Sequence, residues 1–161
     1  MINYKEIEKA IEAKAPLDLQ EDWDNSGWQI RLKTDFNKIL LALEIRSDVI
    51  EEAVTKGCDL IVTHHPLIFG ALNQVVGLEG IDFSDGEEVD SNNITANMII
   101  DLIQEGISVY STHTPFDKCA GGNNDYLGHM LHIDKFSVSE SGDVYVRVGE
   151  FFDAVSLDEI M

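Results

Sequence analysis

Three histidines and one aspartate stand just after two short apolar runs of this 161-residue chain. His64 and His65 follow the first run, and His113 follows the second, with Asp117 four residues further on. Imidazole and carboxylate groups together suit Zn, Mn, Fe or Ni, and the sequence alone does not choose among these metals. If the two runs are neighbouring strands, their ends bring the four side chains to one edge of a sheet. The pattern therefore predicts the start of a metal site.

The two adjacent histidines leave more than one role open. Consecutive side chains at a strand end point in different directions, so His64 and His65 suit two adjacent ions, or one ligand and one supporting residue. Asp117 can bind one ion or bridge two. A histidine pair before Pro66 can also be a simple capped strand end. The second run, with a histidine and an aspartate of its own, keeps the metal site open as the alternative.

Each apolar run begins after a glycine that ends a helix. Residues 38–45 are nearly continuously apolar, which is typical of a strand buried on both faces. Residues 48–56 have helical spacing and stop at Gly57, and the next strand follows at once. The pattern returns over 95–112, where Gly106 separates a helix from a strand. These β-α-β units predict an α/β fold with a mixed, largely parallel sheet, flanking helices and a metal site at the carboxyl ends of the strands.

The N-terminal part predicts one helix and one polar loop. Asn3 begins a capping box, and Pro16 ends the helix that follows it. Residues 21–28 then form a polar stretch that holds both tryptophans, Trp23 and Trp28. Loops often carry function, but a tryptophan beside carboxylates can equally cover the edge of a core, and the sequence leaves both interpretations open.

Two further segments carry polar side chains that are weaker candidates. Residues 69–93 are aperiodic and acidic, and their spacing favours a solvated loop over a calcium site. After a pair of glycines, Asn123 or Asn124 is predicted to cap another helix. His129 and His132 lie on or just past that helix. Without a carboxylate partner in the sequence nearby, they are interpreted as surface histidines.

The C-terminal residues predict the opening of a second segment. Apolar and polar side chains alternate over residues 135–148 as in a hairpin that turns at Ser141-Gly142. A capping box at 156–159 announces a helix, yet the chain stops two residues later. We therefore expect an α/β metal-binding domain over residues 1–133 and, over 134–161, the beginning of a second segment whose remainder is missing from the sequence.

Composition narrows the class of protein. The formal net charge is −19, from 30 acidic and 11 basic residues, and such a surface disfavours nucleic-acid binding. No apolar run reaches the roughly 18 residues of a membrane helix, and the N-terminus lacks the form of a secretory signal. The two cysteines, Cys58 and Cys119, are too few for a disulfide scaffold. These features predict a cytoplasmic protein without a membrane partner.

Four motifs occur in order along the chain: Glu21-Asp22-Trp23-Asp24-Asn25-Ser26-Gly27, Thr63-His64-His65-Pro66-Leu67-Ile68-Phe69, His113-Thr114-Pro115-Phe116-Asp117 and Gly121-Gly122-Asn123-Asn124-Asp125-Tyr126-Leu127. Together they resemble the NIF-three-like family of dinuclear metal-centre proteins, often labelled type 2 homologues of GTP cyclohydrolase 1. The resemblance covers almost the whole chain. It implies an α/β fold, a toroidal homohexamer and two divalent transition-metal ions.

The resemblance also implies roles for single residues. His64, His65 and Asp117 match metal ligands of the family, and His113 matches a position that lines the site. Trp23 and Asp24 match the signature loop beside it. Family members continue into a second half, where a further histidine and a glutamate four residues later complete the metal pair. Because the sequence ends before that half, the resemblance implies an incomplete site.

Two functions follow as hypotheses. The first is a two-metal hydrolase acting on a nucleotide or another phosphate-containing small molecule, with His113 as the candidate base. The second is a non-catalytic module that binds metal or a partner and keeps the oligomeric assembly without turnover. The identity of the substrate is not readable from the residues.

Overall fold

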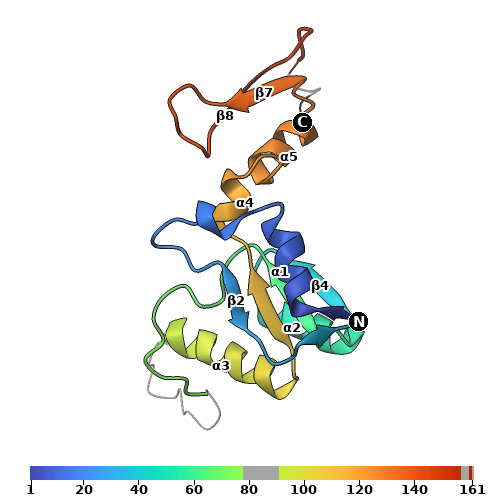
Figure 1. Ribbon diagram of the computed structural model, residues 1–161, viewed down its shortest axis with the longest axis vertical. Helices are drawn as coiled ribbons and strands as arrows, with labels where there is room; N and C mark the ends of the chain where they lie inside the picture. Colours follow the sequence, from blue (N-terminus) through green and yellow to red (C-terminus); the bar gives the residue numbers. More distant parts are fainter. Residues whose placement is uncertain (78–90, 157–159, 161) are drawn as a thin grey trace.

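The computed structural model describes residues 1–77, 91–156 and 160. A four-stranded sheet forms its centre, with the strands in the order β2 (Gly27–Ile30), β6 (Ser108–Ser111), β5 (Leu60–Thr63) and β4 (Ile39–Ala42) (Figure 1). β4, β5 and β6 run parallel, and β2 is antiparallel to β6. The predicted mixed, largely parallel sheet is therefore confirmed.

Two helices cover one face of the sheet. α2 (Ser47–Lys56) connects β4 to β5, and α3 (Ser91–Gln104) leads into β6. α2 ends at Gly57, whose φ of 64° is a left-handed conformation that glycine adopts without strain. Apolar side chains from both helices and from the strands, Ile61 and Val109 among them, form the larger core between them. The helix predicted to begin at residue 95 begins earlier, at Ser91.

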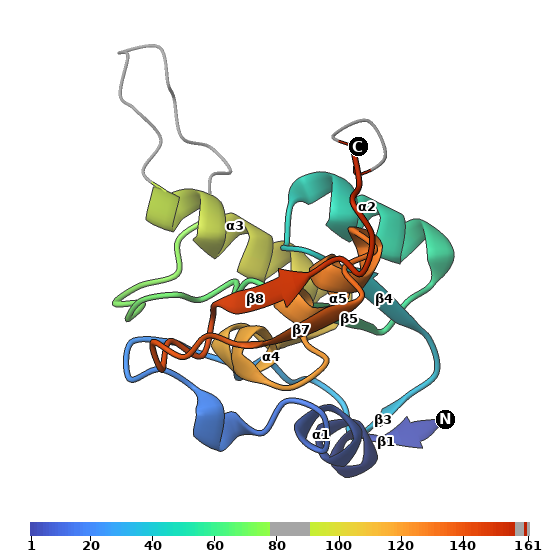
Figure 2. The same cartoon turned by 90° about the horizontal axis from the view of Figure 1, so that it is seen from above.

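The opposite face is covered by α1 (Tyr4–Glu12) (Figure 2). Asn3 and Glu6 form the predicted capping box at its start. Beside α1, β1 (Ile2–Asn3) pairs with β3 (Asp35–Phe36). Trp28 belongs to this second core rather than to a loop, because it lies in β2 and stacks on Phe36 with ring centroids 5.7 Å apart. Of the two tryptophans, only Trp23 remains in the polar loop.

The prediction that 38–45 is buried on both faces is wrong in one respect. Leu40 and Ala42 pack against the larger core. Ile39 and Leu41 point to the other face, where Leu41 is 76% exposed. β4 is one of the two edge strands of the sheet, and the described residues cover only one of its faces.

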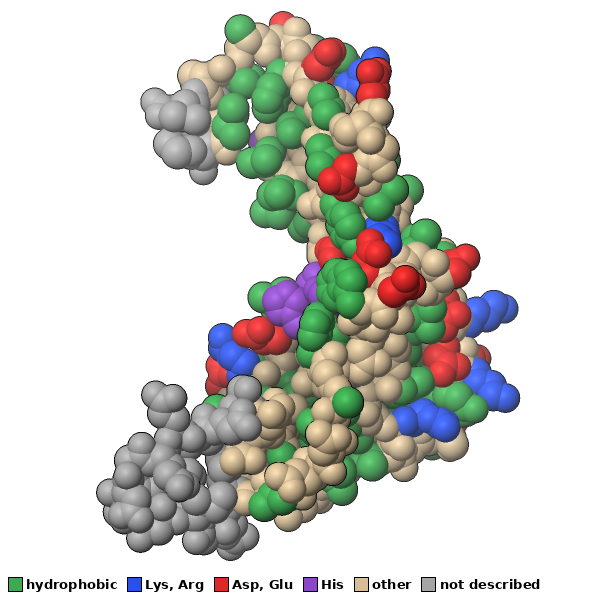
Figure 3. All heavy atoms as spheres, turned by 90° about the vertical axis from the view of Figure 1, so that its left-hand side faces the viewer, with side chains coloured by type: hydrophobic (Ala, Val, Ile, Leu, Met, Phe, Trp, Pro, Cys, Tyr) green, Lys and Arg blue, Asp and Glu red, His purple; other side chains and the backbone are tan. Residues whose placement is uncertain are grey.

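The chain after β6 extends away from the sheet. It forms α4 (Thr114–Lys118), α5 (Asn123–Met130) and a hairpin of β7 (Lys135–Val138) and β8 (Arg147–Glu150), as Figure 1 shows. The hairpin confirms the predicted pairing, and Gly142 in its turn has a φ of 80°. In the space-filling view the molecule is bent, with histidine side chains at the inner corner of the bend (Figure 3).

Some expectations fall outside the described residues. The acidic stretch, with its less favoured calcium alternative, lies mostly within 78–90, and most of the C-terminal capping box lies within 157–159. The division into 1–133 and 134–161 stays a prediction. Among the described residues, no helix combines the length and the apolar character needed to cross a membrane.

Candidate metal site

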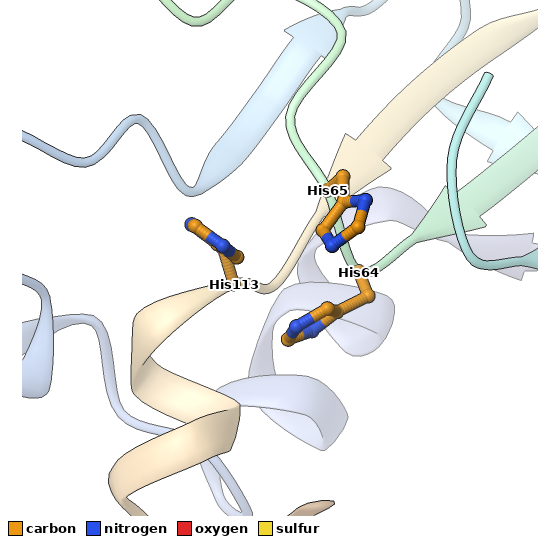
Figure 4. Close-up of side chains that lie close together, drawn as sticks. All are labelled: His64, His65 and His113. Carbon is orange, nitrogen blue, oxygen red and sulfur yellow. The ribbon is translucent and has the colours of Figure 1, made fainter. Parts of the chain in front are cut away.

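Three imidazole rings meet beyond the carboxyl ends of β5 and β6 (Figure 4). The two strands are parallel neighbours with Thr63 opposite Ser111, so the residues that follow them leave the sheet side by side. His64, His65 and His113 each offer a ring nitrogen, and the three nitrogens lie within 4.8 Å of one another. This is the edge at which an α/β sheet places its ligands, as the sequence predicts.

All three histidines are oriented through the same ring nitrogen. Each Nδ1 faces an oxygen that can only accept a hydrogen bond, so Nδ1 carries the proton and Nε2 keeps a free lone pair. The pairs are His64 with the carbonyl of Thr112 at 3.0 Å, His65 with Glu44 at 3.2 Å, and His113 with Asp24 at 2.9 Å. Metal-binding histidines are typically held in this way.

Asp117 extends the cluster on the side of His64. Its Oδ1 lies 3.4 Å from His64 Nε2, and the Asn123 amide donates to that same oxygen at 2.9 Å. A carboxylate oxygen and an unprotonated nitrogen both present lone pairs, and in this structure the Asn123 amide lies against both of them, 3.3 Å from His64 Nε2; a metal cation between the two atoms would satisfy the same lone pairs. A tetrahedral ion with bonds of about 2.1 Å separates its ligand atoms by about 3.4 Å. The donor set thus fits a divalent transition metal.

Burial supports the neutral form of His64. Removal from water lowers its pKa, and this effect outweighs the nearby Asp117 carboxylate, which raises it. A histidine that is neutral at pH 7 has the free lone pair that a metal ligand requires.

Asp24 joins the signature loop to the start of α4. Its side chain is 0% exposed and accepts hydrogen bonds from His113 Nδ1, from the Thr114 amide and hydroxyl, and from Ser26 Oγ. Burial raises its pKa, but the hydrogen bonds from Thr114 and His113 outweigh that and lower it, so the carboxylate stays charged. Asp24 therefore fixes His113 without facing the site itself.

Trp23 also lies beside His113. Its ring centroid is 6.0 Å from that of His113, and its side chain is exposed. All six residues singled out from the sequence, His64, His65, His113, Asp117, Trp23 and Asp24, thus gather at this edge. Their individual roles stay predictions.

Sequence reasoning missed two side chains that support the site. Glu44 follows β4 and faces His65. Asn123 was expected to cap α5, but Gly122 holds the cap position, and the Asn123 amide turns to Asp117 and to His64 Nε2, 3.3 Å away. Asn124, the other cap candidate, donates to the carbonyl of Tyr145 instead. The closeness of the glycine–asparagine motif to Asp117 in the sequence is the signal that could have suggested a role for Asn123. His129 and His132 are exposed, as expected.

Replacing Asn123 with alanine is expected to weaken Zn²⁺ binding about tenfold, because groups that orient metal ligands typically contribute 10–100-fold in affinity. Isothermal titration calorimetry with ZnCl₂ measures the change in affinity. Asn124→Ala is the matched control, since its amide donates to the hairpin and not to the site. Equal affinities for the Asn123 and Asn124 variants would contradict the assignment.

Comparison with known proteins places this geometry in a family. Residues 2–161 match the family model described as Duf34/NIF3 (NGG1p interacting factor 3). The chain is 30% identical over 161 residues to the GTP cyclohydrolase 1 type 2 homolog of Clostridium acetobutylicum, covering 99% of this chain and 55% of that protein. It is 34% identical to the NGG1-interacting factor 3 of Saccharomyces cerevisiae, covering 88% of this chain and 51% of that one.

A solved structure has a similar fold. Reduced HcgD from Methanocaldococcus jannaschii superposes with a TM-score of 0.72 at 29% sequence identity, covering 92% of this chain and 54% of that one. The chain spans about half the length of the curated relatives it matches. The resemblance carried by the four sequence motifs is confirmed, and the chain belongs to the Duf34/NIF3 family.

Proposed function

We propose that this protein binds divalent transition-metal ions through His64, His65 and Asp117 and uses them to hydrolyse a small molecule. The observation that carries the proposal is the convergence of one ring nitrogen from each of the three histidines, whose Nδ1 atoms each face a hydrogen-bond acceptor, together with Asp117 Oδ1 at 3.4 Å from His64 Nε2. Zn, Mn, Fe and Ni all suit such ligands. Two ions are proposed from the family resemblance and from the two directions in which the adjacent histidines leave the chain.

A bound divalent metal would supply the acidity that turns water into a nucleophile near neutral pH. Within the chain, His113 Nε2 can accept a proton, while the buried Asp24 carboxylate on Nδ1 stabilises the resulting imidazolium. His113 also lies close enough to the other two histidines to serve as a third ligand. The two roles differ in one measurable respect, since only a ligand is needed for metal binding.

The test of the metal site is a titration of the metal-free protein with ZnCl₂ and, separately, MnCl₂. The wild type is expected to bind about one or two ions per chain with micromolar or tighter affinity. His64→Ala should lose stoichiometric binding because it removes a half-buried ligand. His129→Ala is the matched control, an exposed histidine on α5. If His64→Ala and His129→Ala bind the metal equally well, the proposed site is wrong.

Turnover separates hydrolysis from the non-catalytic alternative. Hydrolysis of bis(4-nitrophenyl) phosphate by the metal-loaded protein, lost in His113→Ala while the bound metal is retained, would identify His113 as the proton carrier. Loss of both would identify it as a ligand. Full metal occupancy without turnover on this and on nucleotide substrates would favour a metal-binding module that works without catalysis.

We also propose an assembly and a division into domains. The resemblance suggests a homohexamer, and the exposed side chains of Leu41 and Leu43 at the sheet edge offer apolar surface for it. We propose 1–133 as the metal-binding domain and 134–161 as the beginning of a second segment. Sedimentation equilibrium of the chain measures its oligomeric state directly.

A further inference from the structure

Two large aromatic side chains stand exposed beside the histidine cluster. Trp23 is 58% exposed and Phe69 is 54% exposed. Their ring centroids lie 5.9 Å apart with the planes inclined by 41°, and each centroid lies 6.0 Å from that of His113. The three rings therefore border one small area, apolar on the side of Trp23 and Phe69 and polar on the side of His113.

The loops that carry these rings are tied to each other. The side-chain amide of Asn25 donates to the backbone carbonyl of Ile68 at 2.6 Å, and the backbone N–H of Ile68 donates to Gln29 Oε1 at 3.1 Å. Asp24, next to Trp23, is fixed by its buried hydrogen bonds. The backbone segments that carry the two aromatic residues are thus tied to each other before any ligand arrives, which reduces the entropy lost on binding.

We propose that Trp23 and Phe69 bind a planar aromatic ring of a small molecule whose polar end reaches the histidine cluster. This inference gives the substrate class of the proposed metal site. It rests on the proposed function only for the contact between the polar end of the ligand and the metal. Aromatic side chains stack on flat rings through their faces, and such contacts contribute beyond the burial of apolar area. An aliphatic group of equal size gains the area but not the stacking, so the two kinds of ligand can be told apart.

The experiment compares two carboxylates with the same ten-carbon fused-ring skeleton. 2-Naphthoate is planar and aromatic, whereas trans-decahydronaphthalene-2-carboxylate is saturated and puckered. Titration calorimetry of the Zn²⁺-loaded protein should show the aromatic acid binding about tenfold more tightly. Trp23→Leu and Phe69→Leu, which keep an apolar side chain, should each bring the ratio close to one. Trp28→Phe is the control, because Trp28 packs in the second core and should leave the ratio unchanged.

Equal binding of the two acids by the wild type would overturn the proposal, as would a preference that survives both leucine variants. A fall in oligomeric state in Trp23→Leu would also overturn it, because the rings would then be covered by a second copy of the chain. The same titrations without metal separate this proposal from the metal site. If Zn²⁺ fails to bind but the aromatic preference remains, only the proposed function is lost. If Zn²⁺ binds and no preference is found, only the aromatic site is lost.

Discussion

Replacing Asp24 with alanine is expected to destabilise the protein by about 3–5 kcal/mol, because each buried donor that loses its acceptor costs about 1–3 kcal/mol. The carboxylate is fully buried, and its loss leaves the Thr114 amide and hydroxyl and His113 Nδ1 without their acceptor. Urea unfolding followed by circular dichroism measures the change. Asp22→Ala, in the same loop but exposed, should stay within about 0.5 kcal/mol of wild type. A loss below about 1 kcal/mol in Asp24→Ala would contradict the role given to this carboxylate.

The Asp24 carboxylate also makes the stability of the folded protein depend on pH. The folded-state pKa of Asp24 is lowered from its ordinary value near 3.8, so its charged form stabilises the folded state at neutral pH. That contribution is complete above the ordinary pKa and is lost as the pH falls through the lowered one. We expect Asp24→Asn to remove part of the loss of stability that the wild type shows below about pH 4. An identical acid profile in the two proteins would contradict this.

The gathering of the histidines at the carboxyl edge of the sheet could be predicted from the sequence, because local patterns determine it. Helices that stop at Gly57 and Gly106, each followed by a short apolar strand, specify parallel strands, and parallel strands end on the same side. Residues placed directly after those strands, His64 and His113, must then be neighbours. The convergence of the histidines needed no knowledge of distant contacts.

The supporting residues could not be predicted, because tertiary contacts decide them. Asn123 has the residue type and position of a helix cap, yet Gly122 takes the cap and the amide turns to Asp117 across the α4–α5 turn. Trp28 lies in a polar stretch of sequence, but its strand pairs with β6 and its ring enters the second core. In both cases the local preference was sound, and a contact made in the folded chain prevailed over it.

β4 shows the opposite error. A continuous apolar run predicts burial on both faces, but hydropathy does not state what lies against the second face. Leu40 and Ala42, on one face, pack against the larger core, while Ile39 and Leu41, on the other face, are exposed. The apolar strand was predicted correctly, but the sequence pattern does not specify which elements cover each of its faces.

Gly122→Ala is expected to disturb both the fold and the metal site. A β-carbon at position 122 would lie 1.9 Å from the carbonyl oxygen of Phe116 and 3.0 Å from that of Cys119, so backbone must move to admit it. Overpacking of this kind costs about 1–3 kcal/mol, and contact with rigid backbone places this variant at the upper end. Because Asn123 follows directly and holds Asp117 and His64, the movement should also weaken Zn²⁺ binding about tenfold.

Gly70→Ala provides the control, since a β-carbon there meets nothing within 4 Å. Urea unfolding and ZnCl₂ titration of both variants separate the two effects. The Gly70 variant should match the wild type in both measurements, whereas the Gly122 variant should change in both. A Gly122 variant that loses stability but binds Zn²⁺ with unchanged affinity would show that the α4–α5 turn supports the fold without positioning Asn123. The close contact at Gly122 would then explain why the turn needs a glycine, and the orientation of His64 would depend on the Thr112 carbonyl alone.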